Sequence, residues 1–149
     1  MAIITLEQVV EDDADLLADL RVLAMRESLE RIGRFDAQRA RQRLLTDFSA
    51  GWTRHIICEL QRVGFVVVKP KADDLLLDHL YLHPDFQGGG IGAATLAILF
   101  AEADAQGKIL HVGALRESVA NHFYVRHGFV LCEQAQYDNY YIRQPQKGG

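Results

Sequence analysis

The feature that most constrains the fold of this chain is a run of glycines between an apolar, strand-like segment and an apolar, helix-like segment. Residues 80–93 read Leu-Tyr-Leu-His-Pro-Asp-Phe-Gln-Gly-Gly-Gly-Ile-Gly-Ala. Glycine tolerates positive φ, so the backbone N–H groups of such a loop can point into one hollow. The helix expected from Ile91 adds unpaired N–H groups and the positive end of its dipole. The junction therefore predicts an anion site that suits a pyrophosphate.

A plain connection, a dinucleotide-binding turn and a P-loop fit the glycine run less well. A tight connection without a ligand needs one or two glycines, and here four of the five residues from Gly88 to Gly92 are glycine. Gly88-x-Gly90-x-x-Ala93 matches the dinucleotide-binding pattern formally, but it lies mid-chain and the next strand closes with Ala-Leu-Arg, without an acid. A P-loop has Lys and Ser or Thr after its last glycine, whereas two alanines follow Gly92.

Hydrophobic periodicity predicts a single α+β domain over residues 1–149. The helix-like segments are residues 11–31, a second helix that Asp36 can cap, residues 91–106 and residues 118–127. The strand-like segments are residues 3–6, 55–60, 63–69, 74–82, 109–115, 129–132 and 140–143. A tight turn is expected at residues 61–62. Segments in this order indicate one sheet with helices on both faces.

Composition and local sequence patterns limit the binding partners and the cellular compartment that can be expected for this chain. A formal net charge of -4 gives no reason to expect nucleic-acid binding. The N-terminus lacks a signal-peptide pattern and no apolar run is long enough to span a bilayer, so we expect a cytoplasmic protein without a membrane partner. Cys58 and Cys132 lie in strand-like runs and are expected to be buried free thiols. His79 and His83 precede Pro84 on a strand, without an evident third ligand, so no metal site is expected.

A second block, residues 120–129, reads Ala-Asn-His-Phe-Tyr-Val-Arg-His-Gly-Phe. It is similar to the Phe-Tyr-x-x-x-Gly-Phe helix of the GNAT acetyltransferase superfamily. Gln87, Gly90 and Gly92 stand at the marked positions of that family's Gln/Arg-x-x-Gly-x-Gly/Ala loop, in the expected order and separation. The chain therefore resembles this family over most of its length. The resemblance implies a mixed, mostly antiparallel sheet of about six or seven strands with helices on both faces.

The same resemblance implies direct transfer of an acetyl group from acetyl-CoA to a primary amine of a small molecule or peptide. The loop backbone would bind the pyrophosphate, and the backbone of residues 80–82 would pair with the pantetheine arm. Glu117 stands where many members carry Asn, so Asn121, one turn later, is expected to make that contact. The residues expected at acetyl-CoA are Leu80, Tyr81, Leu82, Gln87, Gly88, Gly89, Gly90, Ile91, Gly92, Ala93, Asn121 and Tyr124.

Tyr124 is expected to be the general acid. Coenzyme A leaves as a thiolate, and a thiol with a pKa of about 8.5 can take or share the proton of a phenol with a pKa of about 10. A tyrosine that only packs in the core is the alternative.

The expected base is Asp78. Many family members carry Glu or His at the position of Leu76 or of Asp78, and Leu76 cannot accept a proton. Side chains alternate along a strand, which would put His79 on the opposite face unless a bulge shifts the register. His79 has the better intrinsic pKa for the task. The pattern is also compatible with a purely structural Asp78 and with an amine that solvent deprotonates before it binds.

In family members, the first helix and the segment before the second cover the acceptor. The residues expected there are Arg21, Met25, Arg26 and Phe35, and Tyr137, Tyr140 and Tyr141 could edge the same pocket. Each could equally belong to a solvated face. The expected partner is the amine acceptor, with a homodimer left open. A catalytically weak acetyl-CoA-binding regulatory module is the alternative function.

Overall fold

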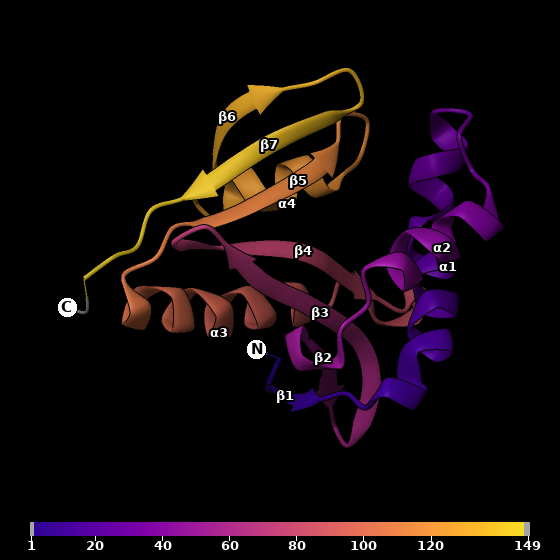
Figure 1. Cartoon of the computed structure of the whole chain (residues 1–149), viewed down its shortest axis with the longest axis horizontal. Helices are drawn as coiled ribbons and strands as arrows, with labels where there is room; N and C mark the ends of the chain where they lie inside the picture. Colours follow the sequence, from indigo (N-terminus) through magenta and orange to yellow (C-terminus); the bar gives the residue numbers. More distant parts are fainter. Residues whose placement is uncertain (1, 148–149) are drawn as a thin grey trace.

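The computed structural model describes residues 2–147, which form a seven-stranded sheet with helices on both faces (Figure 1). The strands are β1 (Ile4–Gln8), β2 (Thr53–Cys58), β3 (Gln61–Lys71), β4 (Asp74–Leu82), β5 (Leu110–Leu115), β6 (Val130–Gln134) and β7 (Asp138–Arg143). Their order across the sheet is β1-β2-β3-β4-β5-β7-β6. Among the described strands, β4 and β5 alone run parallel. This mixed, mostly antiparallel sheet confirms the expected fold class.

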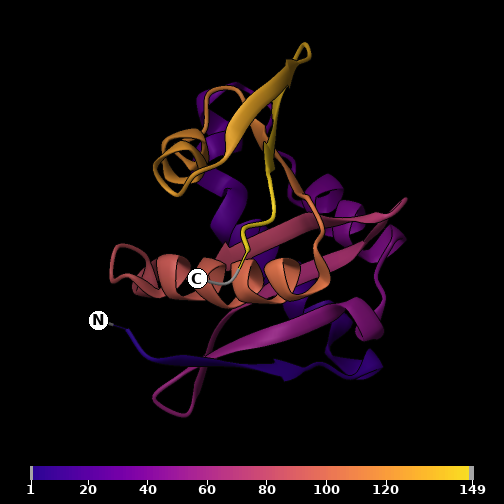
Figure 2. The same ribbon diagram turned by 90° about the vertical axis from the view of Figure 1, so that its left-hand side faces the viewer.

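The two faces of the sheet carry different helix pairs (Figure 2). On one face α1 (Ala14–Arg31) and α2 (Ala37–Thr46) pack against Phe65 and Val67 of β3. On the other face α3 (Ile91–Gln106) and α4 (Ala120–Arg126) cover the larger core, which includes Leu77 of β4. Burial of these apolar side chains is the main stabilising contribution to both layers.

The ends of the long helices follow the chemistry of their capping residues. The carboxylate of Asp36 accepts the backbone N–H of Arg39 at 3.0 Å, which confirms the expected cap of α2. Gly90 and Gly107 flank α3, and both adopt the left-handed conformation, with φ of 84° and 64°. That conformation strains any residue that has a Cβ, so glycine suits both positions.

Two expectations about the strands are wrong. The turn between β2 and β3 lies at Glu59 and Leu60, which adopt φ of 50° and 68°, rather than at residues 61–62. Cys132 is exposed, because β6 is the edge strand and all five of its residues face solvent at least in part. Cys58 is half-buried. Both cysteines are free thiols, as expected.

The sheet opens between its two parallel strands. β4 and β5 pair only through Leu75–Leu110, Leu76–His111 and Leu77–Val112. Beyond Leu77, β4 continues along β3 to Leu82, while β5 continues along β7 to Leu115. The later part of β4 therefore has no strand partner on its β5 side, and backbone groups on that edge are available to a ligand.

Candidate active site

The glycine loop lies at the end of β4 and leaves an open, uncapped helix start. Gly88 and Gly90 have φ of 81° and 84°, and a Cβ added at Gly88, Gly89 or Gly90 would meet nothing within 4 Å. No side chain caps the first turn of α3, and that turn contains no acidic residue. Unpaired N–H groups, a helix dipole and open space together suit a bound anion. The loop is therefore open to an anion, and its contact with the pyrophosphate of acetyl-CoA stays a prediction.

Two loop residues also have structural contacts of their own. Nε2 of Gln87 donates to the carbonyl oxygen of Leu82 at 3.1 Å, which fastens the loop to the end of β4. A Cβ at Gly92 would lie 3.0 Å from the ring of Phe123, so glycine is needed there for α3 to approach α4. Whether Gln87 and Gly92 also contact acetyl-CoA stays a prediction.

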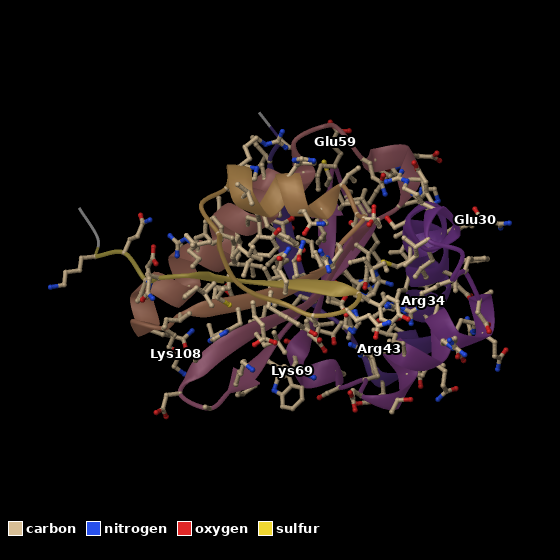
Figure 3. All side chains as sticks on the ribbon, turned by 90° about the horizontal axis from the view of Figure 1, so that it is seen from above. Glu30, Arg34, Arg43, Glu59, Lys69 and Lys108 are labelled. Carbon is tan, nitrogen blue, oxygen red and sulfur yellow. The ribbon has the colours of Figure 1, made fainter. Side chains whose placement is uncertain are left out.

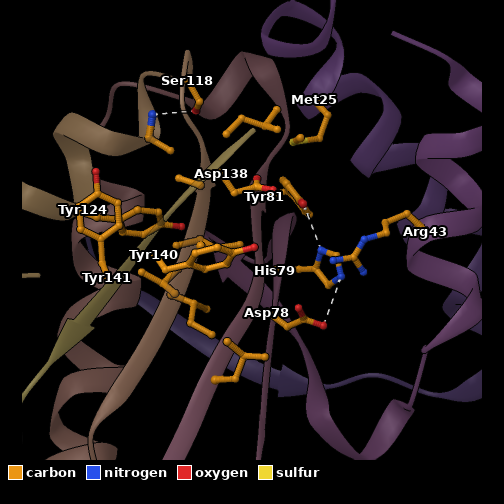
Figure 4. Close-up of a pocket in the computed structure, with 18 of the residues that line it drawn as sticks. Met25, Arg43, Asp78, His79, Tyr81, Ser118, Tyr124, Asp138, Tyr140 and Tyr141 are labelled. Carbon is orange, nitrogen blue, oxygen red and sulfur yellow. Dashed lines mark hydrogen bonds and ion pairs between the residues drawn. The ribbon is translucent and has the colours of Figure 1, made fainter. Parts of the chain in front are cut away.

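A cavity of about 760 Å³ lies along the separated parts of β4 and β5, between the α1–α2 pair and β7 (Figure 4). β4 contributes its residues from Leu76 to Tyr81, and β5 contributes those from His111 to Leu115. Tyr124 of α4 and Tyr140 and Tyr141 of β7 line it as well. A cavity of this volume accommodates a small molecule.

A β-bulge at Asp78 changes which side chains face this cavity. Val67 pairs with His79 and Val68 pairs with Leu77, so Asp78 is the extra residue of β4. Asp78 and His79 therefore face the same side, and Oδ2 of Asp78 lies 3.6 Å from Nε2 of His79. The sequence put His79 on the opposite face from Asp78 unless a bulge shifted the register, and this bulge is present.

Lys69 of β3 is the other partner of Asp78. Its Nζ lies 3.0 Å from Oδ2, the same oxygen that faces His79. The side chains of Lys69 and Asp78 are 22% and 12% exposed, which leaves the pair at the cavity wall rather than in solvent. Asp78 lines the cavity, so an acceptor could approach its carboxylate.

Tyr81 links the His79 imidazole to a buried arginine. Nε of Arg21 donates to the Tyr81 hydroxyl oxygen at 3.0 Å, and Nη1 of Arg21 donates to the carbonyl oxygen of Ala40 at 2.7 Å. The Tyr81 hydroxyl lies 3.1 Å from Nδ1 of His79. Arg21 can only donate, so the Tyr81 oxygen accepts from it. In the arrangement in which Tyr81 donates its proton to Nδ1, a neutral His79 has its own proton on Nε2, toward Asp78.

His79 is neutral at ordinary pH. Burial lowers its pKa from 6.5 to about 4, against the opposing effect of the Asp78 charge, and the positive charges of Arg21, Arg43 and Lys69 lower it further. The imidazole therefore takes part in this chain of contacts as a neutral group. Figure 4 shows the Arg43 side chain reaching from α2 to the neighbourhood of the His79 ring.

Tyr124 is a buried phenol whose hydroxyl is not engaged elsewhere. Its ring packs against Phe123, Phe129 and Tyr141, with centroid separations from 5.3 to 6.4 Å. No group of the described residues hydrogen-bonds to its hydroxyl, and the side chain lines the cavity. Burial, and to a smaller extent the nearby Tyr81 phenol, raise the pKa of Tyr124 above its ordinary value. The phenol thus stays protonated and can donate a hydrogen bond to a ligand.

Asn121 is held within the protein. Its Nδ2 donates to the carbonyl oxygens of Leu115 at 2.7 Å and Ser118 at 2.8 Å. Its Oδ1 accepts from Nδ2 of Asn139 at 2.9 Å and from the Tyr141 hydroxyl at 2.7 Å. These contacts join the end of β5 to α4 and β7. The expected contact of Asn121 with acetyl-CoA stays a prediction.

The residues expected around the acceptor divide into two groups. Arg21 and Met25 line the cavity, together with Tyr140 and Tyr141. Arg26 and Phe35 lie outside it, where the Arg26 guanidinium is 5.0 Å from the centre of the Phe35 ring and pairs with Glu30. The cavity lining also includes three arginines that were not among the expected residues: Arg34, Arg39 and Arg43. The last two are four residues apart on α2, a spacing that puts them on one face of the helix but does not by itself indicate a site.

Residues 51–131 match a family model described as an acetyltransferase (GNAT) domain. The chain belongs to the GNAT acetyltransferase family. This GNAT chain gave no match among curated proteins. Within residues 2–147 it has no group of three or more His, Cys, Asp or Glu side chains that could hold a metal ion.

Solved structures of several acetyltransferases share the fold. The PaiA N-acetyltransferase from Thermoplasma acidophilum, solved in complex with coenzyme A, is similar with a TM-score of 0.79 at 16% identity, over 95% of this chain and 99% of that one. An acetyltransferase from Thermus thermophilus is similar with a TM-score of 0.75 at 23% identity, over 97% of this chain and 99% of that one. The ribosomal-protein-S18-alanine N-acetyltransferase from Escherichia coli is similar with a TM-score of 0.70 at 14% identity, over 99% of this chain and 97% of that one.

Proposed function

We propose that this GNAT chain transfers the acetyl group of acetyl-CoA to a primary amine of a small molecule or peptide by direct attack. One observation carries the proposal. The cavity lies where β4 and β5 separate, and the open glycine loop follows β4 after the short turn Pro84–Phe86. Acetyl-CoA with its pyrophosphate at residues 88–93 could therefore extend its pantetheine arm along residues 80–82 toward the cavity. Coenzyme A in the similar PaiA structure supports this substrate.

In the proposed reaction, the amine nitrogen attacks the thioester carbonyl carbon, the new C–N bond forms and the C–S bond breaks. An alkylammonium has a pKa of about 10, so it must lose a proton before the nitrogen can attack. Asp78 is the proposed acceptor of that proton, because its carboxylate lies at the cavity wall. His79, 3.6 Å away from it, is the alternative base. A backbone N–H of residues 80–82 would polarise the thioester carbonyl.

Tyr124 is the proposed acid. Its free hydroxyl can donate a hydrogen bond to the sulfur as negative charge develops there. Because burial raises the pKa of Tyr124, complete proton transfer to the thiolate is less favourable than for an ordinary tyrosine. We therefore propose that hydrogen-bond donation to the departing thiolate is its main contribution, with the phenol proton replaced from solvent if it is transferred.

Thiol release tests the proposal. Purified protein is mixed with acetyl-CoA and panels of small amines, amino acids, polyamines and peptides, and free coenzyme A thiol is measured together with the mass of the acetylated product. We expect release that depends on an amine and yields an N-acetyl product. Tight binding of acetyl-CoA without turnover in any panel would favour the regulatory module instead.

The cellular location and the oligomeric state of this chain remain predictions. No helix within residues 2–147 has both the length and the apolar character to cross a membrane. The cytoplasmic location rests on the sequence alone. A homodimer also stays a prediction, and the edge strand β6, with Val130 and Leu131 exposed, is one surface where a second copy could pair.

A further inference from the structure

The arginines of α1, α2 and the loop between them divide by their position relative to the cavity. Those that lie outside the cavity lining are each paired with carboxylates: Arg26 with Glu30, Arg31 with Glu27, and Arg41 with Asp15 and Asp19. Those that line the cavity are Arg21, Arg34, Arg39 and Arg43, and none of them has a carboxylate partner among the described residues. Figure 3 shows Arg34 and Arg43 on the inner side of this helical region and Glu30 at its outer edge.

Two of the four cavity arginines are occupied by neighbouring groups. Arg21 donates to Tyr81 and to the Ala40 carbonyl oxygen. The Arg34 guanidinium lies 4.1 Å from the centre of the Tyr137 ring, a cation–π arrangement. The side chains of Arg39 and Arg43 make no hydrogen bond or ion pair within residues 2–147. They stand one turn apart on the same face of α2, so their guanidinium groups can converge on one ligand.

The acidic groups of the cavity do not neutralise this pair. Asp36 accepts a backbone N–H as the cap of α2, and Asp78 pairs with Lys69. Glu133 and Asp138 line the cavity from β6 and β7. These strands lie apart from α2 in the fold (Figure 1). The α2 wall of the cavity is therefore mainly cationic, apart from Asp36. The β6–β7 wall carries Glu133 and Asp138, with Arg34 over Tyr137 next to them, and Lys71 lines the cavity as well.

A ligand that carries both a cationic and an anionic group complements these two walls. A guanidinium group forms paired, charge-assisted hydrogen bonds with carboxylates and phosphates. An ammonium group is attracted to the carboxylates of the β6–β7 wall and to Asp78. A diamine would place a second positive charge near Arg39 and Arg43, and an alkylamine would leave both without a partner. The chemistry thus favours an acceptor whose amine is accompanied by an anionic group.

Resting on the acetyltransferase function proposed above, we propose that the acceptor is a small amine that also bears a carboxylate or a phosphate, and that Arg39 and Arg43 bind this anionic group. These two arginines determine which amine is used.

Matched acceptors test the preference in the full-length protein. Each ω-amino acid from glycine to 6-aminohexanoate is compared with the alkylamine that lacks its carboxylate, and phosphoethanolamine is compared with ethanolamine. We expect kcat/KM for the best anionic acceptor to exceed that of its uncharged-tail counterpart by about tenfold or more, as for hydrogen bonds to charged groups. Comparison of the gain from a carboxylate with the gain from a phosphate shows which anionic group is preferred. Equal or better use of the alkylamines or of 1,3-diaminopropane would overturn the proposal.

Substitutions on α2 test whether the preference for anionic acceptors depends on Arg39 and Arg43. Replacement of both Arg39 and Arg43 by Gln should remove the preference, so that kcat/KM for each anionic acceptor falls to that of its alkylamine counterpart. Arg43→Glu should shift the preference toward 1,3-diaminopropane. Arg41→Gln, on the same helix but paired with α1, is the matched control and should leave the preference intact. An unchanged preference in the double variant would contradict the assignment to these residues.

Calorimetry separates failure of this proposal from failure of the proposed reaction. The same acceptor pairs are titrated into protein saturated with coenzyme A, so no turnover is required. If no amine releases thiol, the proposed reaction is wrong. Tighter binding of the anionic acceptors, lost in the double variant, would still support the anion site, and equal binding of both kinds would contradict it.

Discussion

Oδ2 of Asp78 lies 3.6 Å from Nε2 of His79, although the two residues are consecutive on β4. Neighbouring residues of a regular strand point to opposite faces, and the bulge at Asp78 brings both side chains to the cavity. The candidate base is thus a pair of adjacent groups, with the Asp78 carboxylate also 3.0 Å from Lys69. The neutral imidazole is held on its other side by Tyr81.

A pH–rate profile distinguishes the two candidate bases. A group that must accept a proton produces an acidic limb in kcat/KM. If Asp78 is the base, Asp78→Asn should lose that limb and regain part of its activity at high pH, where free amine is populated. His79→Gln should then retain the limb. The reverse result would assign the base to His79, and a limb retained by both variants would indicate deprotonation by solvent.

Stability should depend on pH through His79. The unfolded chain binds a proton at the ordinary pKa of 6.5 and the folded chain only at about 4, so unfolding takes up a proton between these values. The free energy of unfolding should therefore fall as the pH decreases from 7 to 4, with His79 contributing up to about 3 kcal/mol. Chemical denaturation of wild type and His79→Gln at several pH values measures this contribution.

The exposed His122, on α4, provides the control for that experiment. His122→Gln should keep the wild-type pH dependence, and only His79→Gln should flatten it. Carboxylates with a lowered pKa, such as Asp104 beside Arg143, contribute equally to all three proteins and cancel in the comparison. Equal slopes for wild type and His79→Gln would show that His79 is not buried in its neutral form.

Gly90→Ala and Gly107→Ala form a matched pair that separates backbone strain from ligand binding. Both glycines have positive φ and open space at the missing Cβ. Each substitution should lower the free energy of unfolding by about 1 kcal/mol, the cost of a left-handed residue that has a Cβ. Calorimetry with acetyl-CoA should show weaker binding for Gly90→Ala only. Equal affinities of the two variants would contradict a cofactor site at the loop.

Tyr124→Phe should lower kcat without lowering stability. Its hydroxyl has no partner within the described residues, whereas the Tyr141 hydroxyl donates to Asn121 at 2.7 Å. Loss of a hydrogen bond to the departing thiolate should lower kcat about tenfold or more, which corresponds to about 1.4 kcal/mol of barrier. Tyr141→Phe should instead lower the free energy of unfolding by about 1 kcal/mol. A wild-type kcat for Tyr124→Phe, under conditions where chemistry limits the rate, would refute the proposed role.

The parts of the fold that the sequence predicted are those specified by local chemistry. The predicted bounds of α3 agree with the structure, because an apolar helical pattern lies between Gly90 and Gly107. Asp36 was recognised as a cap from residue type and position alone. The turn at Glu59 and Leu60 was missed, since neither residue is a usual left-handed type.

The site was predicted less completely because it depends on contacts between distant segments. The bulge at Asp78 has no signal in the Leu-rich run before it, and it arises from pairing with β3. The exposure of Cys132 follows from the position of β6 at the sheet edge, which a strand pattern does not reveal. Arg39 and Arg43 stand out only once the cavity and the pairing of the neighbouring arginines are known.

Initial rates of thiol release, measured while acetyl-CoA and an accepted amine are varied together, test the central claim most directly. Direct attack requires both substrates on the protein at once, so we predict release that depends on the amine and intersecting double-reciprocal lines. Parallel lines would indicate a covalent acetyl-enzyme, with the cavity-lining Cys132 as a candidate nucleophile, and would contradict direct attack. Release that does not depend on any amine would contradict the assignment as an N-acetyltransferase.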